Sequence, residues 1–503
     1  MPFLVRDQIA LNLAIPKEKV RVIGTPLGGG FGGKCDITIE ILLALGALRT
    51  GRPVKMTLTR PESLRMSSKR HAFDMHFKIG ATQEGRFTAL QAHLVSDAGA
   101  YAGLSAAIME QAIIFAGGPY VWPNVEVEGY AVYTNNVVGG AFRGFGINQV
   151  AFALESCLDE LARRLALDPF ELRLRNALEV GSVTITGERL KASVAIKETL
   201  RQAQAALKKT APIVTNRRLG IGVAAGYKNV GSGRGNVNFA GAVVELQENG
   251  TLLVRASAVD LGQGVRTVLS QIAAEVTGID YDRIEIITGD TALIPPGAGA
   301  LGQRQTFVAG NAVLRASQEF RGAVVGYVAR QYGLPAEGLI IQGDRIVHKD
   351  RGTLLTLGEL ARLALSEGDA LRGAYEYHAP PTYPIIGDTE ATQPVLRDGR
   401  SLLAHDTISS RFARPGTPVE VEEMMLEFDP EEYRNYFAYD YTTQVALVDV
   451  DEQTGETRLL RLISAHDAGR VLNAQKVKGQ LESSAVMGMG YALSEEFVMR
   501  GGV

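Results

Sequence analysis

Four short passages of the chain combine glycine with residues that can contact an anionic ligand. They are residues 28–34 (GGGFGGK), 141–146 (AFRGFG), 260–264 (DLGQG) and the stretch around Gly479-Gln480. We predict that each lies between an extended segment and a helix. Glycine lets backbone N–H groups reach a ligand, and a helix N-terminus adds unpaired donors and a positive dipole end. Four such passages predict a large, polar, phosphate-bearing ligand.

Polar side chains within these passages suit the same kind of ligand. Arg143 carries a planar, permanently charged guanidinium, and Gln263 and Gln480 each offer a donor and an acceptor, as reading the edge of a heterocycle requires. Taken singly, each has a plainer interpretation: a tight turn, an ion pair or a helix cap. Their combination favours the ligand.

The first glycine passage also permits a different interpretation. Residues 28–34 match the first seven positions of a phosphate-binding P-loop, GxxxxGK, whose next position should be Ser or Thr to hold Mg²⁺. Here that position is Cys35, a poor ligand for this cation. An NTPase is therefore a minor alternative. A thiol at a predicted helix start is also expected to be stabilised as the thiolate.

Composition limits the remaining classes of function. With two cysteines, Cys35 and Cys157, the chain cannot hold an iron–sulfur cluster alone or build a disulfide framework. The seven histidines are scattered, so no metal held by protein ligands is predicted. A net charge of −3 gives no case for nucleic acid or an anionic membrane as a partner, and no apolar run is long enough to span a bilayer. We expect a cytoplasmic protein.

The elements that must position these residues alternate between strand-like and helix-like patterns. This alternation predicts a mixed α/β (α+β) fold. Two long hairpins, each leading into a loop and a helix, suggest two lobes, residues 1–212 and 213–503. The predicted strands are 20–23 and 130–133, the hairpins are 239–259 and 441–464, and the helices are 36–48, 148–165, 267–276, 312–332 and 476–493.

Five stretches in this order resemble the molybdopterin-binding (large) subunit of the xanthine dehydrogenase/aldehyde oxidase family, across most of the chain. They are GGGFGGK at 28–34, TNNVVGGAFRGFGINQ ending at Gln149, DLGQG at 260–264, GALGQRQTFVAGNAV ending at Val313, and HDAGRVLNAQKVKGQLESSAVMGMGYALSEEF ending at Phe497. The resemblance implies that 1–212 and 213–503 are the two molybdopterin-binding lobes of that fold, the second incomplete at its C-terminus.

This resemblance implies a cofactor in which molybdenum is held by the dithiolene of a pterin, as a molybdopterin cytosine dinucleotide, and not by protein ligands. Site residues carry over by position. The implied cofactor-binding residues are Gly30, Phe31, Gly32, Gly33, Arg143, Gln263, Gly302, Gln303 and Gln480, and the implied substrate-pocket residues are Cys35, Gln111, Phe142 and Phe145.

The family's activity is the oxidation of a carbon atom with water as the oxygen source, with electrons leaving through iron–sulfur and FAD modules. This chain carries neither module, so an iron–sulfur subunit and a FAD subunit are the implied partners. Cys35 stands where purine-oxidising members have an acid, and Gln111 where they have an arginine. These departures disfavour a purine and leave another N-heteroaromatic, an aldehyde or an aromatic thioester as the expected substrate.

The chain is expected to be cut at both ends. It starts close to its first glycine motif, and it stops at Val503, before the segment that carries the family's catalytic glutamate. No catalytic residue is therefore assigned. A companion chain that supplies the missing segments is one expectation, and a catalytically inactive cofactor-binding scaffold is the alternative to an enzyme.

Overall fold

The computed structural model describes residues 1–210, 215–385 and 432–499. Its chain forms two compact units. Unit 1 comprises Met1–Gly30, Ile37–Thr57 and Val237–Pro381, and unit 2 comprises Phe31–Asp36, Leu58–Asn236 and Thr382–Val503. Each unit thus draws segments from both sides of residue 212, whereas the predicted lobes 1–212 and 213–503 are continuous; that division stays a prediction.

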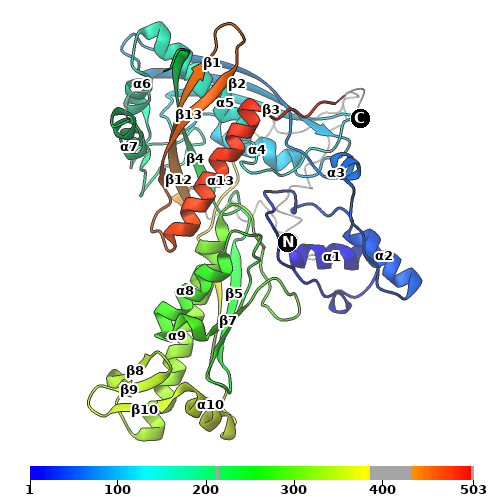
Figure 1. Cartoon of the computed structure of the whole chain (residues 1–503), viewed down its shortest axis with the longest axis vertical. Helices are drawn as coiled ribbons and strands as arrows, with labels where there is room; N and C mark the ends of the chain where they lie inside the picture. The colour runs from blue at the N-terminus through cyan, green and yellow to red at the C-terminus, as the bar shows by residue number, and fades with distance from the viewer. Residues whose placement is uncertain (211–214, 386–431, 500–503) are drawn as a thin grey trace. The chain divides into compact units, whose positions relative to one another are not determined.

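Unit 1 contains a four-stranded sheet with strand order β11-β5-β6-β7 and a small sheet with order β10-β9-β8. Helices α8 and α9 pack against each other, and α9 packs on β5 and β11 (Figure 1). Its elements are α1 (Pro2–Leu13), α2 (Glu40–Thr50), β5 (Phe239–Leu246), β6 (Leu252–Ala256), α8 (Val265–Thr277), β7 (Ile284–Ile287), α9 (Arg304–Tyr332), β8 (Leu339–Gln342), β9 (Arg345–His348), β10 (Gly352–Thr356), α10 (Leu357–Ser366) and β11 (Arg372–His378), with 3₁₀ turns at Lys17–Lys19, Tyr281–Arg283 and Ala336–Gly338.

Sequence patterns explain why unit 1 forms these elements. In α9 the residues Val308, Ala312, Ala316, Phe320 and Val324 recur every four positions, and all are fully buried. This spacing places them along one face of a helix. Buried and partly buried residues alternate along β6 and along residues 242–246 of β5, as a sheet covered on one face requires.

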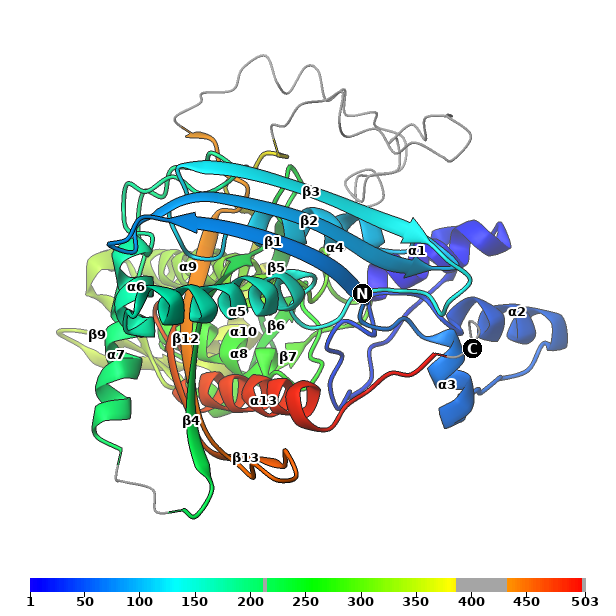
Figure 2. The ribbon, with the colours of Figure 1, turned by 90° about the horizontal axis from the view of Figure 1, so that it is seen from above.

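Unit 2 contains two three-stranded sheets, with strand orders β1-β2-β3 and β13-β12-β4. Helices α4 and α5 lie along one face of the first sheet, where α4 contacts β3 and α5 contacts β1 (Figure 2). Its elements are α3 (Arg60–Met66), β1 (Phe73–Ala81), β2 (Phe87–Gly99), α4 (Ser105–Phe115), β3 (Asn124–Tyr133), α5 (Ile147–Leu165), α6 (Pro169–Asn176), α7 (Ile196–Lys208), β4 (Arg218–Val230), β12 (Ala438–Val450), β13 (Thr457–Asp467) and α13 (Ala474–Leu493).

The core of unit 2 is built around α5. Its residues Val150, Leu154, Leu158 and Ala162 are at most 1% exposed and follow each other at helical spacing. The predicted helix 148–165 is thus confirmed, as are the two hairpins, the strand at 130–133 and the helices 267–276, 312–332 and 476–493. Mixed helix and strand content confirms the predicted α/β (α+β) class.

Near the first glycine passage, one prediction is wrong and another is displaced at its start. Residues 20–23 form no strand: only Ile23 makes an isolated bridge, to Asp290, while Val22 N–H donates to the Thr291 hydroxyl at 3.0 Å. The predicted helix 36–48 is present as α2 but begins at Glu40, whose carboxylate accepts the N–H groups of the preceding Thr38 and Ile39.

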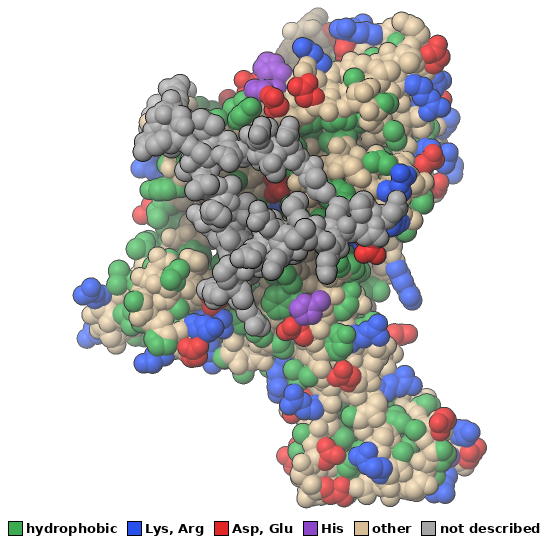
Figure 3. Space-filling view, turned by 180° about the vertical axis from the view of Figure 1, so that it is seen from behind, with side chains coloured by type: hydrophobic (Ala, Val, Ile, Leu, Met, Phe, Trp, Pro, Cys, Tyr) green, Lys and Arg blue, Asp and Glu red, His purple; other side chains and the backbone are tan. Residues whose placement is uncertain are grey.

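The surface carries charges of both signs. In Figure 3 the part of unit 1 formed by β8, β9, β10 and α10, at the lower end, shows basic and acidic side chains next to each other. This mixture agrees with the small net charge of −3. Among the described residues, none of the helices is both long enough and apolar enough to cross a membrane.

Candidate functional site

The first part of the candidate site is a close backbone contact in unit 2. The loop that starts at Phe31 runs against the 141–146 loop, and Arg143 N–H donates to the Phe31 carbonyl at 2.8 Å. Gly32 has a φ of 108°, and a Cβ added there would lie 2.4 Å from the Ala141 carbonyl oxygen. Only glycine fits this position, so the glycine motif serves to bring two loops together.

The Arg143 side chain reaches from this contact to helix α13. Its Nη2 donates to the Gln480 carbonyl at 2.9 Å and lies 3.3 Å from Gln480 Oε1, and its Nη1 donates to the Ser483 hydroxyl at 3.2 Å. The guanidinium carbon lies 5.9 Å from the centre of the Phe31 ring. The structure therefore brings together Phe31, Gly32, Arg143 and Gln480, which are far apart along the chain.

The charge of Arg143 is not neutralised by the described part of the protein. No carboxylate of the described residues lies within 4 Å of its guanidinium, and burial lowers its pKa from the usual arginine value. A half-buried cation held only by neutral acceptors can interact strongly with an anion. This cluster is thus suited to an anionic ligand.

Arg70 adds a second cation beside Arg143 that the sequence analysis did not identify. Its Nη2 donates to the Arg143 carbonyl at 2.7 Å. Its guanidinium carbon lies 4.6 Å from the Phe142 ring centre and 4.8 Å from that of Tyr491, and the two rings meet edge to face. Its Nε is buried without a hydrogen-bond partner. Arg70 occurs outside any glycine motif, so no spacing signal marked it.

The predicted substrate-pocket residues divide into two groups. Phe142 and Phe145 share one turn with Arg143, since Phe145 N–H donates to the Phe142 carbonyl at 2.8 Å. Gln111 on α4 instead is 4% exposed, and its amide donates to the Asn229 side chain at the end of β4. The side chain of Gln111 is thus bound to a protein amide and not to a member of the Arg143 cluster.

Cys35 does not have the environment expected of a reactive thiolate. It lies five residues before the start of α2, so no helix N-terminus stabilises its negative form. Burial, followed by the nearby Asp36 carboxylate, raises its pKa. The expectation of a stabilised thiolate is therefore wrong.

In unit 1 the DLGQG turn closes on itself and approaches the first glycine passage. Gln263 Oε1 accepts the Leu261 N–H at 2.6 Å, and Gln263 Nε2 donates to the Val259 carbonyl at 2.9 Å. A Cβ on Gly262 would lie 3.2 Å from the Leu27 carbonyl oxygen. Gln263 thus fixes a turn whose backbone lies close to the segment that ends in Gly30.

The 299–303 turn leads directly into α9. Gly302 and Gln303 both have left-handed backbone angles, with φ of 52° and 56°, and Gln303 is the N-cap of α9. The amide groups of Gln263 and Gln305 lie 3.0 Å apart and connect the starts of α8 and α9. Two helix N-termini of unit 1 therefore lie next to each other, and at the start of α8 the Asp260 carboxylate accepts the N–H groups of Gly264 and Arg266.

Helix starts follow two of the four glycine passages, 141–146 and 260–264, but not the one with P-loop spacing. Gly146 and Gly264 are N-caps of α5 and α8, with φ of 96° and 80°. Residues 28–34 are separated from α2 by five residues, and no strand precedes them. The P-loop interpretation is therefore wrong. Gln480 also differs from expectation: it lies in the second turn of α13, since the helix begins at Ala474.

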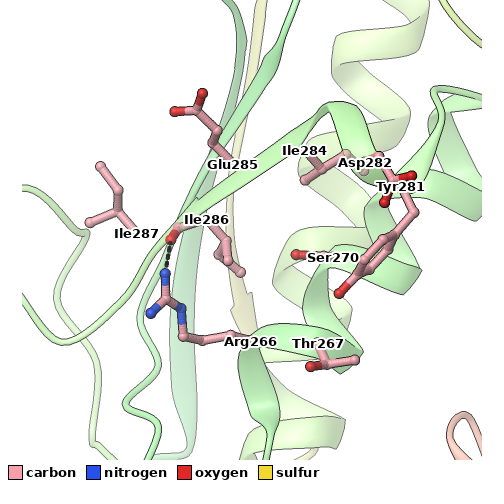
Figure 4. A pocket seen from close by; sticks show the side chains of 9 residues that line it. All are labelled: Arg266, Thr267, Ser270, Tyr281, Asp282, Ile284, Glu285, Ile286 and Ile287. Atoms are coloured by element: carbon pink, nitrogen blue, oxygen red, sulfur yellow. Dashed lines mark hydrogen bonds between the residues drawn. The ribbon is translucent and has the colours of Figure 1, made fainter. Parts of the chain in front are cut away.

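Two other features do not contribute to this site. The described residues contain no group of three or more His, Cys, Asp or Glu side chains that could hold a metal ion. A groove between α8 and β7 is lined by Arg266, Thr267, Ser270, Tyr281, Asp282, Ile284, Glu285, Ile286 and Ile287 (Figure 4). There Arg266 Nη2 donates to the Ile286 carbonyl at 3.0 Å, so this cation covers the edge of the sheet.

Two family models describe the chain, both as a molybdopterin cofactor-binding domain, over residues 1–177 and 189–503. The chain is 31% identical over 499 residues to a probable xanthine dehydrogenase subunit of Bacillus subtilis, covering 99% of this chain and 60% of that protein. It is 45% identical over 203 residues to the nicotinate dehydrogenase large molybdopterin subunit of Eubacterium barkeri, covering 40% and 48%.

Solved structures share the fold. Quinoline 2-oxidoreductase from Pseudomonas putida 86 matches with a TM-score of 0.78 at 23% identity, covering 100% of this chain and 60% of that one. Aldehyde oxidoreductase from Desulfovibrio gigas matches with a TM-score of 0.76 at 24% identity, covering 98% and 47%. The chain spans at most about 60% of the length of these relatives. It belongs to the molybdopterin cofactor-binding family of the xanthine dehydrogenase and aldehyde oxidoreductase type.

Proposed function

We propose that the chain is the cofactor-binding part of a molybdenum hydroxylase and that the Arg143 cluster of unit 2 binds the cofactor near its metal. The observation that carries this proposal is a half-buried guanidinium with only neutral partners, held beside a glycine at which any side chain would collide with the Ala141 carbonyl. A cation that no carboxylate neutralises and a backbone without a side chain both suit a bulky anion.

The residues present fit a pterin that carries phosphate. In unit 2, the proposed cofactor-binding residues are Phe31, Gly32, Gly33, Arg143 and Gln480. The residues Gly30, Gln263, Gly302 and Gln303 of unit 1 stay predicted cofactor-binding residues from the family resemblance. The positively polarised start of α9 suits phosphate oxygens. We propose the dinucleotide form of the cofactor, as the family resemblance implies.

When bound, the cofactor supplies two-electron redox chemistry at molybdenum. The chain's own residues would bind the cofactor and orient it. Phe142, which contacts Arg70 and Tyr491, would line the substrate pocket together with Phe145 and Cys35. Gln111 would contribute to the wall of this pocket by holding the Asn229 side chain. Arg143, whose guanidinium is held in place by hydrogen bonds, would stabilise negative charge next to the bound cofactor.

We propose an N-heteroaromatic compound as the substrate and assign an aldehyde as the second choice. Support comes from the 45% identity, over 203 residues, with a nicotinate dehydrogenase large subunit; the identity with an aldehyde oxidoreductase is 27% over 496 residues. Iron–sulfur and FAD subunits would receive the electrons, and the assembly would reside in the cytoplasm.

Purification of the chain with its genomic neighbours tests the proposal. We expect about one molybdenum per chain by mass spectrometry of metals, a pterin nucleotide released by acid, and dye-linked oxidation of nicotinate or quinoline. A folded complex that contains neither molybdenum nor pterin would refute it. A complex loaded with cofactor but inactive towards heteroaromatics and aldehydes would support an inactive scaffold instead.

A further inference from the structure

A lysine lies beside Gln111 in unit 2. Gln111 Nε2, on α4, donates to Asn229 Oδ1, and the same oxygen accepts a hydrogen bond from Lys228 Nζ at 3.1 Å. Because both nitrogen atoms bond to one oxygen atom, the ammonium group of Lys228 and the amide group of Gln111 are neighbours. A positive charge therefore lies next to a residue proposed for the wall of the substrate pocket.

Helix α4 connects this pair of side chains to the Arg143 cluster. The 141–146 loop, which carries Arg143, packs against α4 so closely that a Cβ on Gly146 would lie 2.4 Å from the Ile108 carbonyl oxygen and 3.2 Å from the Ala112 Cβ. Gln111 lies between these two contact positions along the helix. The loop with Arg143 and the side chain of Gln111 thus belong to the same turn of α4.

The hydrogen-bond capacity of Lys228 is only partly used. Its half-buried side chain has the Asn229 oxygen as its one hydrogen-bond acceptor among the described residues. An ammonium group has three N–H donors. Lys197, also half-buried in unit 2, forms an ion pair with Glu179 at 2.5 Å. In contrast with Lys197, Lys228 has donors available to a ligand.

The charge of Lys228 is not neutralised either. Asp440 faces Lys228 in the register of β12 and β4, but its carboxylate lies 3.3 Å from His466 Nε2, and none of the described carboxylates forms an ion pair with Lys228 within 4 Å. Burial is the largest cause that lowers the pKa of Lys228 to about 8; Asp440 raises this pKa and Arg234 lowers it. The surroundings thus disfavour the charged form, and an incoming anion would stabilise it.

Arg234 shows that a carboxylate is supplied where the chain neutralises a cation in this region. Arg234 follows β4, and its Nη1 donates to Glu110 Oε2 at 2.6 Å and to the Ala107 carbonyl at 3.0 Å. Helix α4 therefore offers a carboxylate at position 110 and a neutral amide at position 111. Of the two cations that reach α4 from this end of β4, Lys228 is the one whose charge remains available to a ligand.

We propose that Lys228 is a specificity-determining residue that binds the carboxylate group of an N-heteroaromatic carboxylic acid, next to the Gln111 amide. One ammonium group matches one carboxylate, and a hydrogen bond between two charged groups is about twice as strong as one between neutral groups. A neutral heteroaromatic ring would leave this cation without a partner. This inference rests on the proposed function and narrows its substrate to ring compounds that carry a carboxylate.

Binding of nicotinate and of its neutral amide, nicotinamide, tests the inference. Both are titrated calorimetrically into the complex purified with its genomic neighbours, which is reduced beforehand so that no turnover occurs. We expect the unmodified complex to bind nicotinate at least about tenfold more tightly than nicotinamide. Lys228→Met should lose this preference, with the affinity for nicotinamide changed by less than about twofold. Lys228→Arg, which keeps the charge, should retain part of the preference.

Steady-state oxidation provides a second readout. Lys228→Met should raise the KM for nicotinate at least about tenfold, while kcat/KM for quinoline, which has no carboxylate, should stay within about twofold. Lys197→Met is the matched control, because it removes a half-buried lysine that Glu179 already neutralises, and it should change neither value.

Three results would overturn the inference: an unmodified complex without preference for nicotinate, a preference that persists in Lys228→Met, or an equal loss of activity towards nicotinate and quinoline, which would mark Lys228 as structural. If Lys228→Met does not fold, Lys228→Gln decides by the same comparisons.

Failure of this inference is distinguishable from failure of the proposed function. Molybdenum and pterin content of the purified complex reports on the function alone. A complex that contains the cofactor and oxidises quinoline, but does not distinguish nicotinate from nicotinamide, would reject the role of Lys228 and leave the function standing. A complex with neither molybdenum nor pterin would reject the proposed function, and this inference with it.

Discussion

Arg143 Nη2 lies 2.9 Å from the carbonyl oxygen of Gln480, although 337 positions separate the two residues in the chain. The contact joins the 141–146 loop to the second turn of α13 within unit 2. The arginine also donates its other side-chain hydrogen bonds to neutral oxygens. Its guanidinium is therefore held in place without being neutralised, as a binding group for an anion should be.

Arg143→Ala should abolish cofactor retention with little loss of stability. The side chain makes three contacts to neutral acceptors and no described ion pair, so its removal is expected to cost about 1 kcal/mol of unfolding free energy. Molybdenum content per folded chain and Tm are the two measurements. Arg163→Ala, which removes an exposed pair with Glu160, is the control and should change neither. A large fall in Tm with unchanged molybdenum would identify Arg143 as purely structural.

Gly32→Ala should destabilise the chain strongly, whereas Gly28→Ala should not. A Cβ at Gly32 would collide with the Ala141 carbonyl oxygen at 2.4 Å in a left-handed backbone conformation, and at Gly28 it would meet nothing within 4 Å. We expect a loss of at least about 2 kcal/mol for Gly32→Ala and a change within about 0.5 kcal/mol for Gly28→Ala. Urea denaturation measures both. Equal effects at the two positions would contradict the close approach of the loops.

Glu188 should make stability depend on pH. Burial raises its pKa from 4.5 to about 7, while Tyr439 OH and Asn435 N–H donate to its carboxylate at 2.5 and 2.9 Å. The folded chain therefore holds the proton more tightly than the unfolded chain. This contribution is fully present below about pH 4.5 and is lost as the pH rises to about 7.

A Tm series from pH 5 to pH 8 checks this expectation. The unmodified chain should lose stability on the order of 3 kcal/mol across the window, and Glu188→Gln should flatten that part of the profile. Glu160→Gln is the control, because the pKa of Glu160, lowered to about 2 by Arg163 and Arg164, lies outside the window. A profile that keeps its slope in Glu188→Gln would rule out this carboxyl as its origin.

Cys35 should react slowly with alkylating reagents. Its raised pKa, caused first by burial and then by Asp36, leaves little thiolate at pH 7. Iodoacetamide labelling followed by peptide mass spectrometry should show slower modification of Cys35 in the folded chain than in the urea-unfolded chain. Cys157, whose pKa burial also raises, should behave alike. If Cys35 were labelled faster in the folded chain than in the unfolded chain, the expectation of a stabilised thiolate would be correct after all.

Much of the fold was predictable from local patterns. The hairpins of β5–β6 and β12–β13 and the helix α5 follow from alternation and helical spacing, which residues within one element express by themselves. The strand expected at 20–23 failed for a different reason. Its β-branched residues are suitable, but strand pairing depends on a distant segment, and within the described ranges only Asp290 pairs with these residues, at Ile23.

The site was predictable only in part. Glycine motifs identified Phe31, Gly32, Arg143 and Gln263, because such motifs combine a turn with a polar or aromatic neighbour in one short window. No motif marks Arg70, Ser483 or Tyr491, because an arginine or serine outside a motif cannot be told from any surface residue. Lys228 lies outside every motif as well, and its position beside Gln111 is a property of packing that no spacing expresses.

The interleaving of the two units has a consequence for synthesis and for dissection of the protein. The polypeptide leaves unit 1 after Gly30, re-enters it for Ile37–Thr57, and returns only at Val237. During synthesis, nearly two hundred further residues must be added after α2 before the rest of unit 1 is available to pack with α1 and α2. Neither unit can be excised with a single protease cut or expressed as one uninterrupted gene segment, so any minimal version must be a permuted chain or a reassembly of fragments.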